Sequence, residues 1–126
     1  MLAVSTILFL LLTLGVVLFQ LALLGGAPWG EFTLGGRVKG VLPLRWRFVP
    51  LVSVFLLSGF AAIVAARAGF AFPALQAASH GMVWLVVAYC ALGVLLNAIT
   101  PSRLERKLWL PVTLLMLGAS VAAAVS

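Results

Sequence analysis

Two carboxamides, Gln20 and Asn97, are the side chains best suited to bind a ligand within the long apolar runs of this chain. Each lies near one end of its run. One interpretation places both in a small-molecule pocket that opens toward the cytoplasmic leaflet. The other has them hydrogen-bonding between helices, which contributes about 0.6–2 kcal/mol inside a membrane. The sequence leaves both interpretations open.

The two acidic residues, Glu31 and Glu105, are the next candidates for chemistry. Paired carboxylates can act as acid and base or bind a metal ion. Basic residues lie close to both, because Glu105 is flanked by Arg103 and Arg106 and Glu31 precedes a basic run. We therefore expect structural ion pairs at the cytoplasmic face.

His80 and Cys90 are the single histidine and the single cysteine. The predicted topology puts His80 a bilayer away from both glutamates, so a His–carboxylate pair is not expected. Cys90 lies inside an apolar run and is expected to be a small buried hydrophobe. The chain has no metal-ligand spacing, phosphate loop or nucleophile motif. The sequence predicts a non-enzymatic protein without a metal or cofactor.

The composition shows what surrounds these residues. Of 126 residues 65% are hydrophobic and 8% are charged, whereas about a quarter of a typical soluble domain is charged. Lipid must therefore be the solvent for most of the surface. The net charge of +6 raises the question of nucleic acid, but the basic residues border apolar runs. Anionic headgroups explain them better, and no nucleic-acid partner is expected.

Four apolar runs without Asp, Glu, Lys or Arg predict membrane-spanning helices at about 4–24, 49–66, 81–99 and 108–125. The expected fold is an all-α integral membrane four-helix bundle formed by one domain, residues 1–126. No Lys or Arg precedes the first run, so we expect a retained helix there and not a cleaved signal peptide.

The basic residues predict the orientation. Of the eight Lys and Arg residues, only Arg67 falls outside the two segments that join helices one to two and three to four. The positive-inside rule places these segments in the cytoplasm and both termini outside. The predicted location is a cell membrane with these two segments on its cytoplasmic side. The residues in the basic segments are Arg37, Lys39, Arg45, Arg47, Arg103, Arg106 and Lys107.

Some of these charges are also expected to contact lipid. Arg45, Arg47, Arg106 and Lys107 flank the starts of helices two and four, where their side chains can reach headgroup phosphates while their stems stay on the helices. Anionic lipid in the cytoplasmic leaflet is therefore a predicted partner. Trp29, Trp46 and Trp109 fall at the same boundary and Trp84 at the opposite one, as in an aromatic belt.

The first basic segment, residues 25–48, is rich in glycine. Gly35-Gly36, between two short mixed stretches, is compatible with a two-residue hairpin turn. A faint repeat relates the two halves of the chain, since each has a carboxamide, a proline, a glutamate and a basic cluster in the same order. The repeat would place Pro50 and Pro111 in the first turns of helices two and four.

Short motifs along the whole chain resemble a pattern in small bacterial four-helix integral membrane proteins, a family of unknown function. The resemblance implies an uncharacterised inner-membrane protein, and it implies that the glycine-rich segment and the segment from Asn97 to Pro111 form one face. The motifs are Gly26-Ala-Pro-Trp-Gly30, Gly35-Gly36 and Leu42-Pro-x-Arg45, followed by Asn97, Ser102, Glu105, Arg106, Trp109 and Pro111.

These observations predict a binding or accessory protein for a lipid, an apolar small molecule or another membrane protein, with a second copy of the chain as a further candidate partner. The alternative is a small transporter or a subunit of an oligomeric channel. Such a pore would be lined by Gln20, Asn97, Ser53, Ser58 and Thr113. No Asp, Glu, Lys, Arg or His lies inside the spans, although ion-coupled transporters usually place one there.

Overall fold

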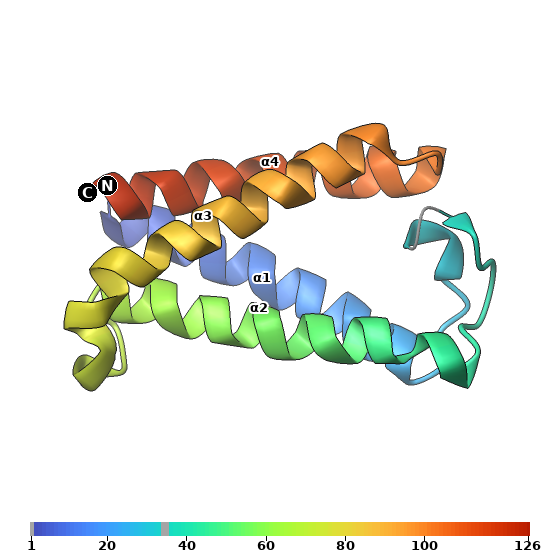
Figure 1. Ribbon diagram of the computed structural model, residues 1–126, viewed down its shortest axis with the longest axis horizontal. Helices are drawn as coiled ribbons and strands as arrows, with labels where there is room; N and C mark the ends of the chain where they lie inside the picture. Colours follow the sequence, from blue (N-terminus) through green and yellow to red (C-terminus); the bar gives the residue numbers. More distant parts are fainter. Residues whose placement is uncertain (1, 34–35) are drawn as a thin grey trace.

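The computed structural model describes residues 2–33 and 36–126, and every regular element in that part of the chain is helical. The long helices are α1 (Leu2–Leu24), α2 (Phe48–Arg67), α3 (Gln76–Ile99) and α4 (Arg103–Val125) (Figure 1). Short 3-10 helices lie in the connections, namely η1 (Gly30–Phe32), η3 (Leu44–Trp46) and η4 (Pro73–Leu75). The predicted all-α class is confirmed.

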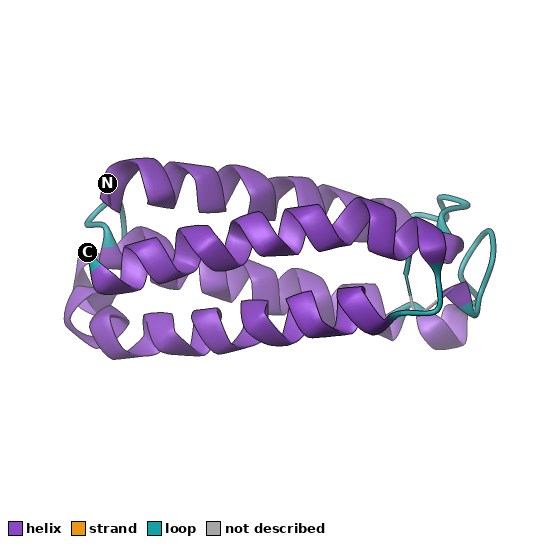
Figure 2. Ribbon diagram, turned by 90° about the horizontal axis from the view of Figure 1, so that it is seen from above, coloured by secondary structure: helices purple, strands orange, loops and turns teal. Residues whose placement is uncertain are grey.

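The long helices form an antiparallel bundle in which each packs against the next and α1 also packs against α4 (Figures 1 and 2). We call the end with the α1–α2 and α3–α4 connections the loop end. The opposite end, which holds both ends of the chain and the α2–α3 connection, is the terminal end. The side of a membrane that each end faces stays a prediction.

All four long helices are long and apolar enough to cross a membrane. The 23 residues of α1 rise by about 35 Å, against about 30 Å for a hydrocarbon core. Their outward faces carry large apolar side chains, such as Val4 and Phe55, which are 67% and 72% exposed. A protein in water rarely exposes apolar surface on this scale. The bundle is therefore compatible with an integral membrane protein.

Tight packing is concentrated in the half of the bundle nearer the terminal end. The fully buried side chains there include Phe9, Val64, Val83, Val86 and Ala123. Small residues among them let the helix backbones approach closely, which is the main source of helix association in lipid.

Helices α3 and α4 both begin several residues before the apolar runs that predicted them. The start of α4 is fixed by Ser102, whose Oγ accepts a hydrogen bond from the backbone N–H of Glu105 at 3.1 Å. This is one half of a capping box, and it adds a polar turn ahead of the apolar run. As a result Pro111 lies inside α4. The prediction that it occupies the first turn is wrong, because apolar length marks the membrane crossing and not the helix start.

The α1–α2 connection folds back on the helix ends. The hairpin turn predicted at Gly35-Gly36 includes Gly35, which lies outside the described residues, but the preceding stretch is the 3-10 turn η1 and not a strand. Gly30 N–H donates to Gly40 O at 2.8 Å. A Cβ on Gly30 would lie 2.2 Å from Val38 O, so only glycine allows this close approach.

Arg47 secures the same connection from its far end. Its Nε donates to Leu42 O at 2.9 Å and its Nη1 to Leu24 O at 3.4 Å. The second bond reaches one of the carbonyl groups at the end of α1 that have no partner within the helix. Arg47 therefore ties the start of α2 to the end of α1.

Candidate functional site

A cavity of about 180 Å³ lies between the four helices in the half of the bundle nearer the loop end. Leu57, Cys90 and Met116, each 4% exposed, line it and also belong to the packed core. These three side chains form the floor of the cavity, which is the wall that faces the terminal end. The polar residues that line the cavity are Gln20, Thr33, Ser53, Asn97, Glu105 and Thr113. The aromatic ones are Phe32, Tyr89 and Trp109.

Gln20 reaches the cavity from the last turns of α1. Its Oε1 atom is buried and has no hydrogen-bond partner within the described part of the chain. A buried acceptor without a partner costs about 1–3 kcal/mol. Gln20 therefore lines the cavity with a carboxamide whose oxygen has no partner among the described residues.

Asn97 enters the same cavity from α3. Its Nδ2 donates to Gly93 O of its own helix at 2.7 Å. Among the described residues neither this carboxamide nor Gln20 forms a bridge between helices. Both carboxamides line the cavity, and their binding of a ligand stays a prediction.

Glu105 lies in the first turn of α4, where the helix N-terminus favours a negative charge. It is the one charged residue among the described residues that line the cavity. Its neighbours Arg103, Arg106 and Lys107 are exposed, so their charges lie on the outer surface. The ion pairs predicted for Glu31 and Glu105 stay predictions.

The turn η1 covers the loop end of the cavity with Phe32 and its neighbour Thr33. Two side chains from the start of α4 hold it in place. Trp109 Nε1 donates to Phe32 O at 2.8 Å, and Ser102 Oγ donates to Glu31 O at 2.8 Å. The expected meeting of the glycine-rich segment with the segment from Asn97 to Pro111 is confirmed by these bonds. We refer to η1 and Thr33 as the cap.

Aromatic side chains brace the cap from α1. The ring of Phe19 contacts Trp109 edge to face, with 4.7 Å between the centroids and 70° between the planes. It also stacks on Trp29 at 5.9 Å and 11°. Edge-to-face and stacked pairs add about 0.5–1.5 kcal/mol beyond burial. Trp109, predicted as a belt residue, is thus an internal link between α1, α4 and the cap.

An outer pocket of about 530 Å³ adjoins the cavity and shares Thr33, Asn97 and Glu105 with it. Its other walls include Arg37 from the α1–α2 connection and Thr100 from the end of α3. The shared residues form the wall between the cavity and the outer pocket at the loop end.

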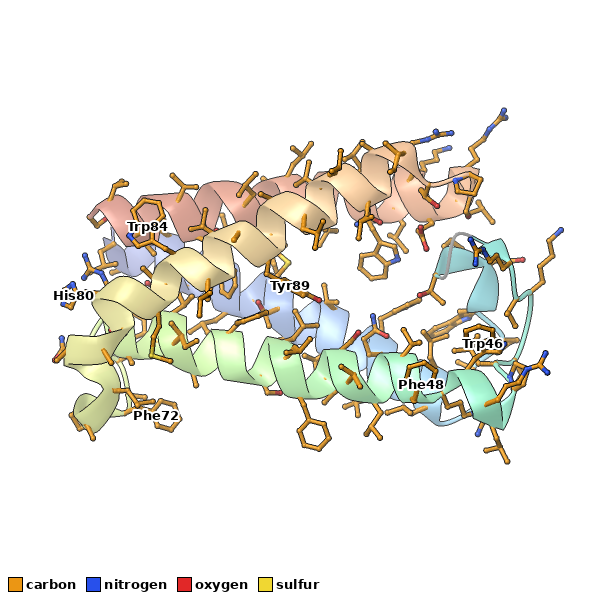
Figure 3. The ribbon with its side chains drawn as sticks, viewed as in Figure 1. Trp46, Phe48, Phe72, His80, Trp84 and Tyr89 are labelled. Atoms are coloured by element: carbon orange, nitrogen blue, oxygen red, sulfur yellow. The ribbon has the colours of Figure 1, made fainter. Side chains whose placement is uncertain are left out.

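Other candidates lie away from the cavity. His80 is exposed at the start of α3, near the terminal end (Figure 3), while Glu105 starts α4 at the loop end. Within the described part of the chain no three His, Cys, Asp or Glu side chains come together to hold a metal ion. Arg45 is exposed, whereas Arg47 is half-buried and holds the connection.

Sequence reasoning did not identify Trp109, Tyr89, Cys90 or the cap as parts of the site. A signal was present in α4, where Glu105, Trp109 and Thr113 are spaced by four and share one helix face. The prediction started this helix at residue 108, which separated Glu105 from the pattern. The cap left no periodic signal.

No family model, curated protein or solved structure matches this chain. Its function must therefore be argued from the geometry of the cavity.

Proposed function

We propose that this protein is a non-enzymatic membrane protein that binds a small molecule in the cavity under the cap. The observation that carries the proposal is the convergence of Gln20, Asn97 and Glu105, from three different helices, on one cavity. Polar side chains are expensive to keep inside a membrane bundle, so the two carboxamides, which lie within the apolar runs, favour a functional role.

The size of the cavity limits the occupant. At about 180 Å³ it is smaller than the roughly 300–1,000 Å³ of pockets for drug-sized ligands. A dry engineered cavity of about 150 Å³ binds benzene. Among the occupants considered from sequence, a small molecule of about one ring fits, whereas a whole membrane lipid does not.

The floor of the cavity favours binding over conduction. Four of the residues assigned to an oligomeric pore line the interior of one bundle, namely Gln20, Ser53, Asn97 and Thr113. The fifth, Ser58, is exposed and lines an apolar groove between α1 and α2. Beyond the floor the core is filled by side chains such as Phe9 and Val86, so the polar path stops inside the bundle.

The setting of the protein is part of the proposal. The basic asymmetry and the sequence resemblance support a bacterial cytoplasmic membrane with the loop end inside. The exposed basic side chains at that end would contact anionic headgroups, and further partners would be another membrane protein or a second copy. Of the basic residues assigned to lipid from sequence, Arg45, Arg106 and Lys107 are exposed and suit this role best.

Cys90 provides a test, since it is the one cysteine of the chain and lines the cavity. Methyl methanethiosulfonate, a small neutral thiol reagent, should modify Cys90 in the folded, detergent-solubilised protein. Intact mass spectrometry would follow the rate. Modification only under conditions that unfold the bundle would overturn the proposal.

Two variants should change the rate of Cys90 modification in opposite directions. Trp109→Phe keeps an aromatic ring but removes the indole N–H that donates to Phe32 O, so it should speed the modification. Trp84→Phe on the exposed surface is the matched control. Gly93→Ala should slow the modification. A Cβ at Gly93 meets Thr113 Cγ2 at 3.7 Å, an ordinary contact, so the added methyl group narrows the cavity without straining the backbone.

A further inference from the structure

We infer that the molecule bound in this cavity is a small organic cation, an amine attached to an apolar group of about one ring. The inference rests on the proposed function and names the ligand class of the same site. Its basis is the sign of the charge in the cavity, the hydrogen-bond acceptors in its wall, and the aromatic lining.

The charge in the cavity is negative. Glu105 is the one acidic residue among the described residues that line the cavity. None of these lining residues is a Lys or an Arg. Charges interact more strongly in a medium of low dielectric constant than in water. A carboxylate offers about four acceptor positions, so bonds to the protein leave acceptors for a ligand. A bound anion would meet only repulsion from this group.

The hydrogen-bonding groups show the same preference. The Trp109 Nε1–H is bonded to Phe32 O, and the Thr113 hydroxyl donates to backbone oxygens of its own helix at 2.8 and 3.1 Å. One Asn97 amide hydrogen is bonded to Gly93 O. The acceptor Gln20 Oε1 has no partner among the described residues. The carboxylate of Glu105 only accepts hydrogen bonds, so a ligand group that approaches it must be a donor.

Aromatic rings supply the remaining contacts. Phe32, Tyr89 and Trp109 line the cavity from three different elements, and Figure 3 shows Tyr89 on the inner side of α3. The face of an aromatic ring attracts a cation, and the attraction grows when water is excluded. The same rings pack against the apolar part of an arylalkylamine.

One basic residue opposes this pattern. Arg37 lines the outer pocket together with Glu105, but it is exposed and does not line the inner cavity. Water and salt screen its charge, so its effect falls on the approach of a cation more than on the bound state. A substitution of Arg37 removes a positive charge near the cavity, whereas Glu105→Gln removes a negative one.

The experiment compares three probes of nearly equal size and different charge: benzylammonium, benzyl alcohol and benzoate. Each is tested for slowing the reaction of Cys90 with methyl methanethiosulfonate in the folded protein at pH 7. We expect half-protection by benzylammonium at a concentration about tenfold below that for benzyl alcohol, which corresponds to one moderate charge interaction. Benzoate should give no protection.

Variants assign the preference to Glu105. Glu105→Gln keeps the shape of the side chain and a residue accepted in the capping box, and it should remove the preference for benzylammonium over benzyl alcohol. Glu105→Asp should restore part of it. Arg37→Gln should leave the preference or increase it. Melting temperatures of all variants verify that the bundle is intact.

The outcomes separate the two proposals. Equal protection by the three probes, or stronger protection by benzoate, would overturn the cation assignment and leave the binding cavity in place. Reaction of Cys90 that no probe slows would overturn both, because the cavity would then admit the reagent and hold only water. A charge preference that survives Glu105→Gln would also overturn the assignment.

Discussion

The two halves of the bundle are built from the same four apolar helices and differ in how they are filled. Near the terminal end, side chains such as Val83 and Ala123 are fully buried. The serines there bond to their own helices, Ser79 to Gln76 O at 2.6 Å and Ser120 to Leu117 O at 2.9 Å. Toward the loop end the α1–α2 pair and the α3–α4 pair lie further apart (Figure 1).

The space between these pairs holds the cavity, two carboxamides, a carboxylate and the cap. The packed half also contains buried hydroxyl oxygens without a partner among the described residues, those of Thr6 and Thr13. Thr13 lines the apolar groove between α1 and α2, but within the described part of the chain no carboxamide or carboxylate lines that groove. The comparison teaches that hydropathy alone does not separate a structural half from a binding half. The distinction lies in which polar groups face an open volume.

The largest expected effect is on the packed half. Phe9→Ala removes a fully buried ring and should destabilise the bundle by about 3 kcal/mol. This loss is at the low end of the range for the cores of soluble proteins, because lipid and not water solvates the separated helix. Phe55→Ala, at a position 72% exposed, should cost less than about 0.5 kcal/mol. Unfolding by sodium dodecyl sulfate in mixed micelles measures both. Similar losses would mean that the terminal half is not the stabilising one.

The sequence predicts the packed half better than the binding half. Four crossings follow from length and hydropathy, because each backbone amide in lipid must be satisfied within its own helix. The cavity depends instead on the rotation of each helix about its axis. The spacing of Glu105, Trp109 and Thr113 defines a face of α4, but which face of α3 it meets is set by packing. The cap depends on contacts between Gly30, Val38 and Gly40 that no periodicity encodes.

The second effect is on the cap. In Gly30→Ala the new methyl group would overlap Val38 O, since the ideal Cβ lies 2.2 Å from it. The resulting backbone shift should cost about 1–3 kcal/mol and speed the modification of Cys90. Gly59→Ala is the matched control, because its Cβ would meet nothing within 4 Å. An unchanged Cys90 rate in Gly30→Ala would show that the cap does not close the cavity.

The third effect separates two neighbouring arginines. Arg47→Gln loses the bonds to Leu42 O and Leu24 O and should destabilise the bundle by about 1–2 kcal/mol. Arg45→Gln should leave stability unchanged, because Arg45 is exposed, and should instead weaken retention of anionic lipid by at most about 1 kcal/mol. Chemical unfolding and native mass spectrometry in mixed lipid would measure the two. Equal stability of both variants would contradict the structural role of Arg47.

The smallest effect has the opposite sign. Gln20→Leu removes a buried acceptor that has no partner among the described residues, so the empty protein should be unchanged or more stable by up to about 1 kcal/mol. The same variant should weaken binding of benzylammonium. A stability loss as large as that of Arg47→Gln would instead indicate that Gln20 supports the bundle and not a ligand.

The hydroxyl group of Ser102 at the loop end takes part in two hydrogen bonds, one to the cap and one to the first turn of α4. Ser102 Oγ donates to Glu31 O of the cap and accepts from Glu105 N–H at the start of α4. Bonds that share an atom in this way polarise and strengthen each other. Release of the cap therefore also loosens the first turn of the helix that carries Glu105. Opening of the cavity and fraying of α4 form one cooperative event, so amide hydrogen exchange at Glu105 should report how often the cavity opens.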